Sequence, residues 1–427
     1  MRRLSFRQWL IFLIGAVLPL PFAFPIPGMS TGRVPIDALF LPFLGVALLI
    51  VSSREWAVLR RDRVAALLLS FAIVSSFSLP VGVMTYGNIN GIRSYGYQVV
   101  LLLNFVLGYL ALRKVDDIKL FVRGFVASLA IVATVLTGYL VAAGNLVDPH
   151  TFHNSDTLRA AISGWPNGFA VLITVAFIMA LYVTTTTTGW MRRIYIGAAV
   201  MLAICELLTF SKTGWIAIAI ALWLIYLRYW KVRLQIAIVV ALALAFIGFF
   251  FVANSSFKEQ IYTLGTVAIR VQFLAVVLTR VNPLTLIIGS GSQSVETLMA
   301  GYAHQKLPSG ISVADLSSHD EFLNVLVKDG LIALVLLAIA IAIIVLRNRK
   351  LTRDKDPEVA HLYRYWYAAT WAIVITLFAG DYLHYWLVGA MFWAMSGGAV
   401  HFVHAREQVV EQPEPHTTSE NRAASAT

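Results

Sequence analysis

The feature that most constrains the fold is a series of apolar runs, each long enough to cross a lipid bilayer. A membrane-spanning helix needs about 20 predominantly apolar residues. Twelve runs of roughly this length lie at approximately 8–24, 35–51, 64–83, 95–112, 120–142, 167–185, 194–209, 213–227, 234–253, 322–346, 365–380 and 382–403. The sequence therefore predicts an all-α, polytopic membrane protein with about twelve transmembrane helices.

The composition excludes an ordinary soluble enzyme. Of the 427 residues, 59% are hydrophobic and 13% are charged, whereas a soluble protein carries about 25% charged residues. The net charge of +11 is therefore interpreted first as a signal for which side of the membrane each loop occupies. Nucleic acid is not an expected partner. The single cysteine, Cys205, allows neither an intramolecular disulfide nor a cysteine-based metal site.

The placement of basic residues predicts the orientation of the chain. With the N-terminus in the cytoplasm, the predicted inner segments hold 24 of the 33 Lys and Arg residues, the outer segments hold 8, and Lys328 lies inside a helix. Cytoplasmic loops of membrane proteins carry an excess of Lys and Arg. We therefore expect both termini to be cytoplasmic.

One apolar segment, 261–281, is predicted to lie in the outer interface rather than to span the membrane. A span here would move the six basic residues of 347–364 to the outside, and Arg270 at its centre would cost about 2.5–3.5 kcal/mol. The outer loop between spans nine and ten then covers 254–321, and loops of this length are usually functional. We expect a helical domain at 1–403 that includes this loop, and a disordered cytoplasmic tail at 404–427.

Four of the outward basic residues are candidates for binding a polyanion at one membrane face. Arg159 precedes the sixth span, Lys212 stands in a short turn between the seventh and eighth, and Arg270 and Arg280 belong to the interfacial segment. Arg offers planar, bidentate donors and Lys a point charge, which together suit a diphosphate. Alternatively, an outer Arg anchors the chain at phospholipid headgroups, and Arg159 pairs with Asp156.

His319 is the candidate catalytic residue. Ser318-His319-Asp320-Glu321 has the form of a capping box, which predicts a helix start with His319 in its first turn. A neutral imidazole at the membrane surface is well suited to accept a proton from a hydroxyl group near pH 7. Alternatively, the histidine only forms a hydrogen bond with Asp320 or with the loop.

Three ionisable residues fall inside predicted spans, where such residues are functional candidates. Glu206 lies six positions before Lys212 and neutralises either that residue or another cation of the site, or it forms a structural ion pair. Lys328 and Asp329 are adjacent, so each is expected to find its partner on a neighbouring helix. The run 289–292, GSGS, either turns backbone amides toward an anion or forms a flexible turn.

The order of these motifs resembles the O-antigen ligase and polymerase superfamily of bacterial envelope glycan transferases. His319-Asp320, then nine residues, then Gly330 is similar to the ligase pattern of a histidine with a short polar neighbour, nine positions and a glycine. The sequence departs from that pattern at Asp320, where asparagine, serine or glutamine is usual, and has Ala333 at the final small position.

Three further segments carry the resemblance. Arg270 to Leu274 resembles the R-x-x-x-L of the family's large outer loop, a pattern that Arg280 to Leu284 also fits. LLTFSKTGWIA is similar to the T-x-S-R-G-x-W turn, with Lys212 in the arginine position. The run from Arg159 to Asn167 resembles the segment before a middle span. The motifs cover roughly 155–345, and the topology covers the whole chain.

The resemblance implies a metal-independent, inverting glycosyltransferase of the GT-C-like type in the bacterial inner membrane, with its active site facing the periplasm and no cofactor. The donor would be a glycan on undecaprenyl diphosphate. The acceptor would be a hydroxyl of lipid A-core for a ligase, or of a second lipid-linked glycan for a polymerase. The implied role of His319 is to activate or orient the acceptor. The diphosphate would be stabilised by four basic residues, Arg159, Lys212, Arg270 and Arg280. Two acids, Glu206 and Asp320, would support the site.

Two alternatives stay open. A polymerase would share these motifs, but the spacing from His319 to Gly330 favours a ligase. A secondary transporter or lipid flippase could also have twelve spans, yet such carriers often show related halves. Here the halves show no similarity and the long loop lies outside, between spans nine and ten, so we favour the transferase.

Overall fold

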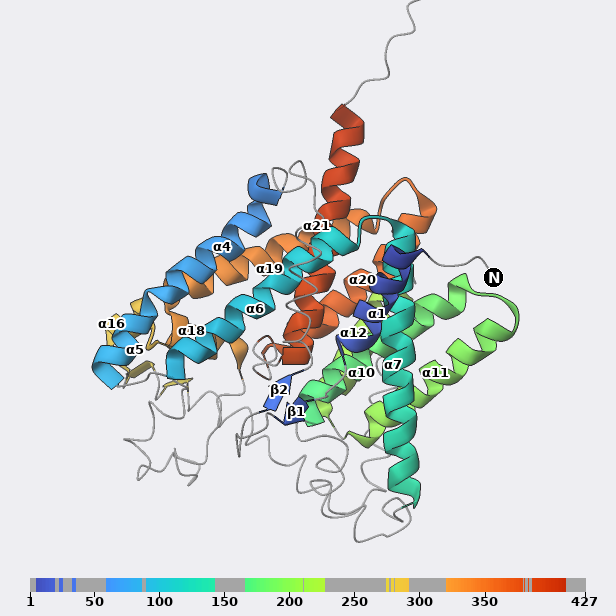
Figure 1. The fold of residues 1–427 in the computed structure, drawn as a ribbon, viewed down its shortest axis with the longest axis horizontal. Coiled ribbons are helices and arrows are strands. Elements are labelled where there is room, and N and C mark those ends of the chain that lie inside the picture. The colour runs from blue at the N-terminus through green and yellow to red at the C-terminus, as the bar shows by residue number, and fades with distance from the viewer. Residues whose placement is uncertain are drawn as a thin grey trace, which may run out of the picture.

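The computed structural model describes fourteen segments of the chain: residues 5–19, 23–25, 33–35, 59–86, 90–142, 166–209, 211–226, 274–275, 278–279, 281–291, 320–378, 380, 383 and 386–411. They form a bundle of long, mostly parallel or antiparallel helices (Figure 1). The elements are α1 (Phe6–Val17), β1 (Ala23–Pro25), β2 (Arg33–Pro35), α4 (Arg63–Ser76), α5 (Ser78–Tyr86), α6 (Asn90–Ala111), α7 (Val115–Ala142), α10 (Pro166–Thr186), α11 (Gly189–Leu208), α12 (Lys212–Ile225), α16 (Pro283–Ile288), α18 (Glu321–Asp329), α19 (Leu331–Leu351), α20 (Pro357–Thr376) and α21 (Trp386–Glu411).

The length and apolarity of the helices identify a helical membrane protein. In the described part of the chain, five helices are long and apolar enough to cross a bilayer: Arg63–Met84, Val115–Tyr139, Asn167–Thr186, Leu331–Leu351 and Leu387–His404. Shorter apolar helices lie at Phe6–Val17, Gln98–Ala111 and Thr213–Ile225. The predicted spans 35–51 and 234–253, and most of the interfacial segment 261–281, lie outside the described residues.

Two predicted spans are not continuous helices. The run 64–83 breaks at Phe77 into α4 and α5, because Pro80 has no N–H and its ring would clash with the carbonyl of Ser76 four residues earlier. The run 322–346 breaks at Gly330, whose φ of 89° no regular helix contains. The span predicted at 64–83 is still long and apolar enough to cross a bilayer as Arg63–Met84, whereas in the second run only Leu331–Leu351, after the break, is such a span.

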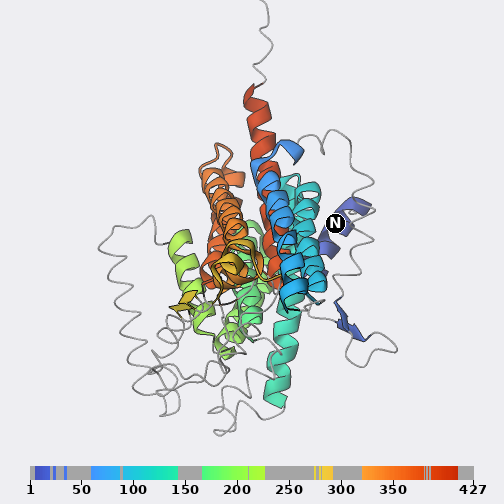
Figure 2. The same ribbon diagram turned by 90° about the vertical axis from the view of Figure 1, so that its left-hand side faces the viewer.

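Two smaller departures concern the ends of the chain. The first is a short antiparallel strand pair, in which Phe24 of β1 lies opposite Val34 of β2; the fold is otherwise all-helical in the described residues, as predicted. The second is the length of α21, which continues to Glu411 and projects from the bundle in both views (Figure 2). The tail expected to be disordered from residue 404 is therefore helical up to residue 411.

Small residues allow the helix backbones to approach closely. A Cβ added at Gly108 or Gly397 would overlap a backbone carbonyl across the interface of α6 and α21. Gly15 and Gly124 have the same relation to the interface of α1 and α7. Helices in a membrane associate through such close van der Waals packing, because lipid offers no hydrophobic driving force between them.

One end of the bundle, here called the basic end, is held by buried and half-buried ion pairs. Asp62 is fully buried as the N-cap of α4, and its Oδ1 accepts hydrogen bonds from the backbone N–H groups of Val64 and Ala65, at 2.7 and 3.0 Å. Its Oδ2 lies 2.6 Å from Arg347 of α19 and 3.0 Å from His404 of α21. Burial acts to raise the pKa of this carboxyl, but the contacts with His404 and Arg347 outweigh burial and hold the pKa below its usual value.

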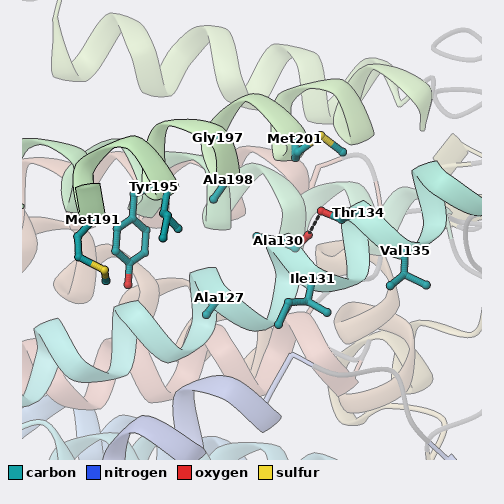
Figure 3. Close-up of a pocket in the computed structure, with 11 residues that line it drawn as sticks. Ala127, Ala130, Ile131, Thr134, Val135, Met191, Tyr195, Gly197, Ala198 and Met201 are labelled. Carbon is teal, nitrogen blue, oxygen red and sulfur yellow. Dashed lines mark hydrogen bonds between the residues drawn. The ribbon is translucent and has the colours of Figure 1, made fainter. Parts of the chain in front are cut away.

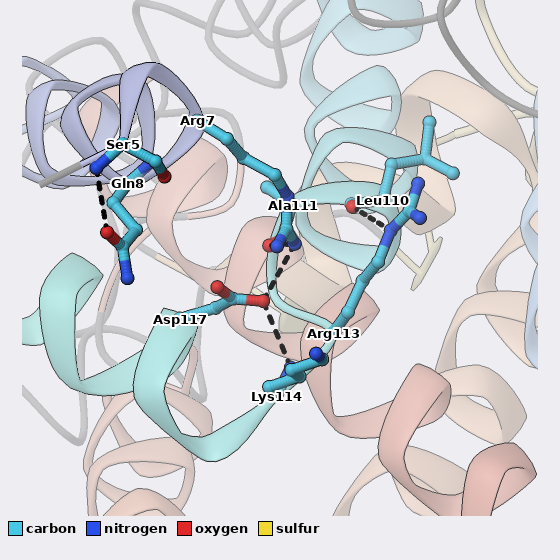
Figure 4. Close-up of polar contacts among 8 residues, drawn as sticks. All are labelled: Ser5, Arg7, Gln8, Leu110, Ala111, Arg113, Lys114 and Asp117. Atoms are coloured by element: carbon cyan, nitrogen blue, oxygen red, sulfur yellow. Dashed lines mark hydrogen bonds and ion pairs between the residues drawn. The ribbon is translucent and has the colours of Figure 1, made fainter.

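Further ion pairs at the basic end join α1, α7, α20 and α21. Arg7 of α1 lies 2.7 Å from Asp117 of α7 (Figure 4). Lys119 of α7 pairs with Glu358 of α20. Near the end of α21, Arg406 lies 3.1 Å from Asp356. All of these segments were predicted to share one side of the membrane, and the structure brings them together.

Candidate functional site

The end of the bundle opposite the basic end contains the helix that follows His319. The described helix α18 begins at Glu321, with Asp320 as its N-cap, and the Asp320 Oδ1 accepts a hydrogen bond from the backbone N–H of Leu323 at 3.0 Å. A start near Ser318 with His319 in the first turn was therefore wrong. Asp320 takes the capping position instead, because an aspartate is as good an N-cap as a serine. His319 itself lies outside the described residues.

Glu321 fixes the start of α18 to the connection between α20 and α21. Its side chain is fully buried, and its Oε2 accepts a hydrogen bond from the backbone N–H of Leu383 at 2.9 Å. Its own backbone N–H donates to the carbonyl of Leu377 at 3.0 Å. In the sequence, Glu321 stands out only as part of a capping box. The available signal was an acid at the mouth of an apolar run, where a charge must find partners.

The other end of α18 is locked by glycines. Gly330 has a φ of 89°, and a Cβ there would overlap the carbonyl of Ile287 at the end of α16. The backbone N–H of Ser290 donates to the carbonyls of Val327 and Lys328, at 2.9 and 3.1 Å. Part of the predicted outer loop thus packs directly against α18. The amide of Ser290 serves this packing, so the GSGS run supports the helix and does not present that amide to an anion.

Asp329, at the end of α18, contacts a neighbouring helix, as predicted for an ionisable residue in a span. The amide Nε2 of Gln98 in α6 donates to its Oδ2 at 3.3 Å, and both side chains are buried. Gln98 is a polar residue inside the apolar run 95–112, and no sequence motif marks it. This contact joins α6 to α18 in the same region as Ser290.

The short turn before α12 places Lys212 at a helix start. Ser211 is the N-cap of α12, with its Oγ accepting from the backbone N–H of Gly214 at 3.3 Å, and Lys212 is the first helical residue. The position of the Lys212 side chain is not among the described features. The turn is compact, since the indole N–H of Trp215 also donates to the carbonyl of Glu206 at 3.4 Å.

Glu206 lies beneath this turn. Its side chain is fully buried, and neither carboxylate oxygen forms a hydrogen bond with a described residue. One oxygen lies where a side chain on Gly214 would stand, so only glycine leaves it room in the first turn of α12. A carboxyl group at a helix N-terminus is favoured by the helix dipole.

The starts of α12 and α18 lie at the same end of the bundle. Thr185, near the end of α10, has its hydroxyl 2.8 Å from Nε2 of His361, near the start of α20, and α11 packs along α10 as it runs back from that end. The end of α11 and the start of α12 at Lys212 therefore lie toward the other end of α20. Leu377 at that far end also holds Glu321 of α18.

The remaining predicted site residues cannot be placed in the same way. Arg159, Arg270 and Arg280 lie outside the described residues, as His319 does. In the described part of the chain, no group of three or more His, Cys, Asp or Glu residues could hold a metal ion. The described part of the site thus consists of Asp320, Glu321, the backbone at Lys212 and the buried Glu206.

Comparison of the chain with protein families and with curated proteins adds no family assignment. No family model matches the chain, and no curated protein matches it significantly. The function must therefore be inferred from the residues themselves.

Proposed function

We propose that the protein is an O-antigen ligase of the bacterial inner membrane. It transfers a glycan from undecaprenyl diphosphate to a sugar hydroxyl of lipid A-core at the periplasmic face. The proposal includes twelve membrane spans in a GT-C-like fold. It also places both termini and the basic end on the cytoplasmic side. The excess of Lys and Arg in the predicted inner segments supports the orientation.

The observation that carries the proposal is the unit between His319 and Gly330. The spacing that resembles the ligase pattern contains one complete helix, with Asp320 as its N-cap and Gly330 as its positive-φ C-cap. The spacing therefore corresponds to the length of one helix between its two caps. The turn that resembles the family's T-x-S-R-G-x-W segment begins α12 at the same end of the bundle.

In the proposed reaction, His319 accepts the proton of the acceptor hydroxyl as its oxygen attacks the anomeric carbon of the donor sugar. The bond between that carbon and the diphosphate oxygen breaks, and the configuration inverts. Undecaprenyl diphosphate leaves with the bonding electrons. The charge that develops on it is stabilised by the basic residues, without a divalent ion: Arg159, Lys212, Arg270 and Arg280. Glu206 and Asp320 support this arrangement.

The transfer assay that tests this role uses purified protein, the lipid-linked donor and lipid A-core. His319→Ala should lower the rate about 10²- to 10⁴-fold, as expected for the loss of a general base. His304→Ala, in the same predicted outer loop, should keep the wild-type rate. Wild-type activity of His319→Ala would refute the role of His319.

The glycan of a deletion strain separates a ligase from a polymerase. Full-length polymer accumulating on the carrier lipid supports the ligase, whereas single repeats attached to lipid A-core support the polymerase. A second assay separates an enzyme from a carrier. Glycan transfer is measured with the protein reconstituted in liposomes without a substrate gradient, and a carrier would show no transfer.

A further inference from the structure

A second candidate site is a groove between α7 and α11, away from the starts of α12 and α18. Its volume is about 560 Å³. Figure 3 shows small residues facing each other across it, Ala127 and Ala130 on α7 against Gly197 and Ala198 on α11. Larger apolar side chains also line it: Ile131, Val135, Met191, Ile194 and Met201.

The groove suits a hydrocarbon chain. Its two polar lining groups are Thr134 and Tyr195. The hydroxyl of Thr134 already donates to the carbonyl of Ala130 at 2.7 Å, and Tyr195 is buried. Gly197 has open space where a side chain would stand. An occupant without hydrogen-bonding groups therefore leaves the Thr134 hydroxyl satisfied, and the remaining lining is apolar apart from the Tyr195 ring and its hydroxyl.

Positive charge gathers at one end of the groove. Both helices begin toward the basic end. For α7 this follows from the ion pair of Asp117 with Arg7. For α11 it follows from α10, which leads into it: Thr185, near the end of α10, lies 2.8 Å from His361 of α20. Arg192 and Arg193 are exposed next to the lining residue Met191. Arg123, one turn before Ala127, is close enough to Tyr195 to interact electrostatically.

An aromatic residue marks the same end as a membrane interface. Trp190 precedes Met191 and is 63% exposed. Tryptophan favours the headgroup level of a bilayer, where its ring lies partly in hydrocarbon and its N–H in water. The groove thus runs from a basic, aromatic rim into an apolar interior, which is the division of a phospholipid into headgroup and acyl chain.

We propose that this groove binds one acyl chain of an anionic glycerophospholipid from the leaflet at the basic end, with its phosphate at Arg192, Arg193 and Arg123. Basic pockets between membrane helices recognise anionic headgroups, and each Lys or Arg near the surface contributes a several-fold gain in affinity. The site is independent of glycosyl transfer.

Binding is measured by native mass spectrometry of the full-length protein in nanodiscs of phosphatidylethanolamine with increasing phosphatidylglycerol. One retained phosphatidylglycerol per chain is expected. Gly197→Leu should remove it by filling the groove. Gly138→Leu is the matched control, because Gly138 of α7 also has open space at its Cβ but does not line the groove. Arg192→Gln with Arg193→Gln should weaken retention about 25-fold, or roughly fivefold for each arginine.

Several results would overturn the proposal. Equal retention by wild type, Gly197→Leu and Gly138→Leu would place the lipid elsewhere. Retention of phosphatidylethanolamine with no preference for phosphatidylglycerol would remove the role of the arginines. Displacement of the lipid by added undecaprenyl phosphate, or a wild-type dimer that Gly197→Leu converts to a monomer, would assign the groove to a different occupant.

Discussion

Asp62 is a single residue on which three helices depend. It caps α4 and contacts Arg347 of α19 and His404 of α21, while its own side chain is fully buried. Removing one partner of a buried ion pair costs several kcal/mol, because the other charge stays without compensation. Arg347 keeps 17% of its side chain exposed, which reduces that cost.

Asp62→Asn should therefore lower the free energy of unfolding by about 2–3 kcal/mol. Asparagine is also a good N-cap, so the change isolates the charge from the cap. The melting temperature in detergent measures the effect. Asp116→Asn is the control, since Asp116 is 81% exposed. Equal melting temperatures for the two variants would contradict a stabilising role for the buried contacts.

The same carboxyl predicts the direction of a pH dependence. The folded-state pKa of Asp62 lies below its unfolded value of about 3.9. Its stabilisation is therefore complete above the unfolded pKa and is lost as the pH falls through the lowered folded pKa. Melting temperatures measured on descent below about pH 4 should fall for the wild type and less steeply for Asp62→Asn. Parallel curves would contradict the assignment.

At the scale of elements, the break between α18 and α19 needs a glycine for two reasons. Gly330 has a positive φ, and it packs directly against the backbone at the end of α16. Gly189, the first residue of α11, has a positive φ of 62° but open space around it. Substitutions at Gly189 and Gly330 therefore distinguish the cost of a positive φ from the cost of close backbone packing.

Gly189→Ala should cost about 1–2 kcal/mol of stability, the usual penalty of a left-handed residue with a Cβ. Gly330→Ala should cost more, about 3 kcal/mol or above, because α16 must also move. It should also lower glycan transfer, since it shifts the helix that follows His319. Melting temperatures and the transfer assay measure both effects. Equal effects of the two variants would show that the contact with α16 is unimportant.

The interface of α6 and α21 offers a second matched pair. Gly108 lies against the backbone of Ala394, whereas Gly96 on the same helix has open space at its Cβ. Gly108→Ala should destabilise the protein by about 1–3 kcal/mol. Gly96→Ala should be neutral or stabilise it by up to about 1 kcal/mol through helix propensity. A destabilisation of the same size in both variants would contradict a special role for the close contact at Gly108.

At the scale of the whole molecule, the ion pairs gather at one end and the candidate site lies at the other. The proposed orientation predicts which end each side of the membrane can reach. In a Cys205→Ser background, Lys355→Cys between α19 and α20 should react with an impermeant maleimide only from the cytoplasmic side. Ser309→Cys in the predicted outer loop should react only from the periplasm. Labelling of both positions from one side would refute the orientation.

The sequence by itself determined the class of the protein and much of its helical pattern, because the length of an apolar run and the side of its flanking charges are local properties. It also selected Asp320, Glu206 and the start of α12. It missed the breaks at Phe77 and Gly330 and the contacts of Glu321 and Gln98. Pro80 is a local signal for the break at Phe77, whereas the others depend on which distant segments meet: Gly330 matters through Ile287, and Glu321 through Leu383. Hydropathy reports transfer into lipid, whereas tertiary structure alone decides which backbone groups approach closely and which buried polar groups become partners.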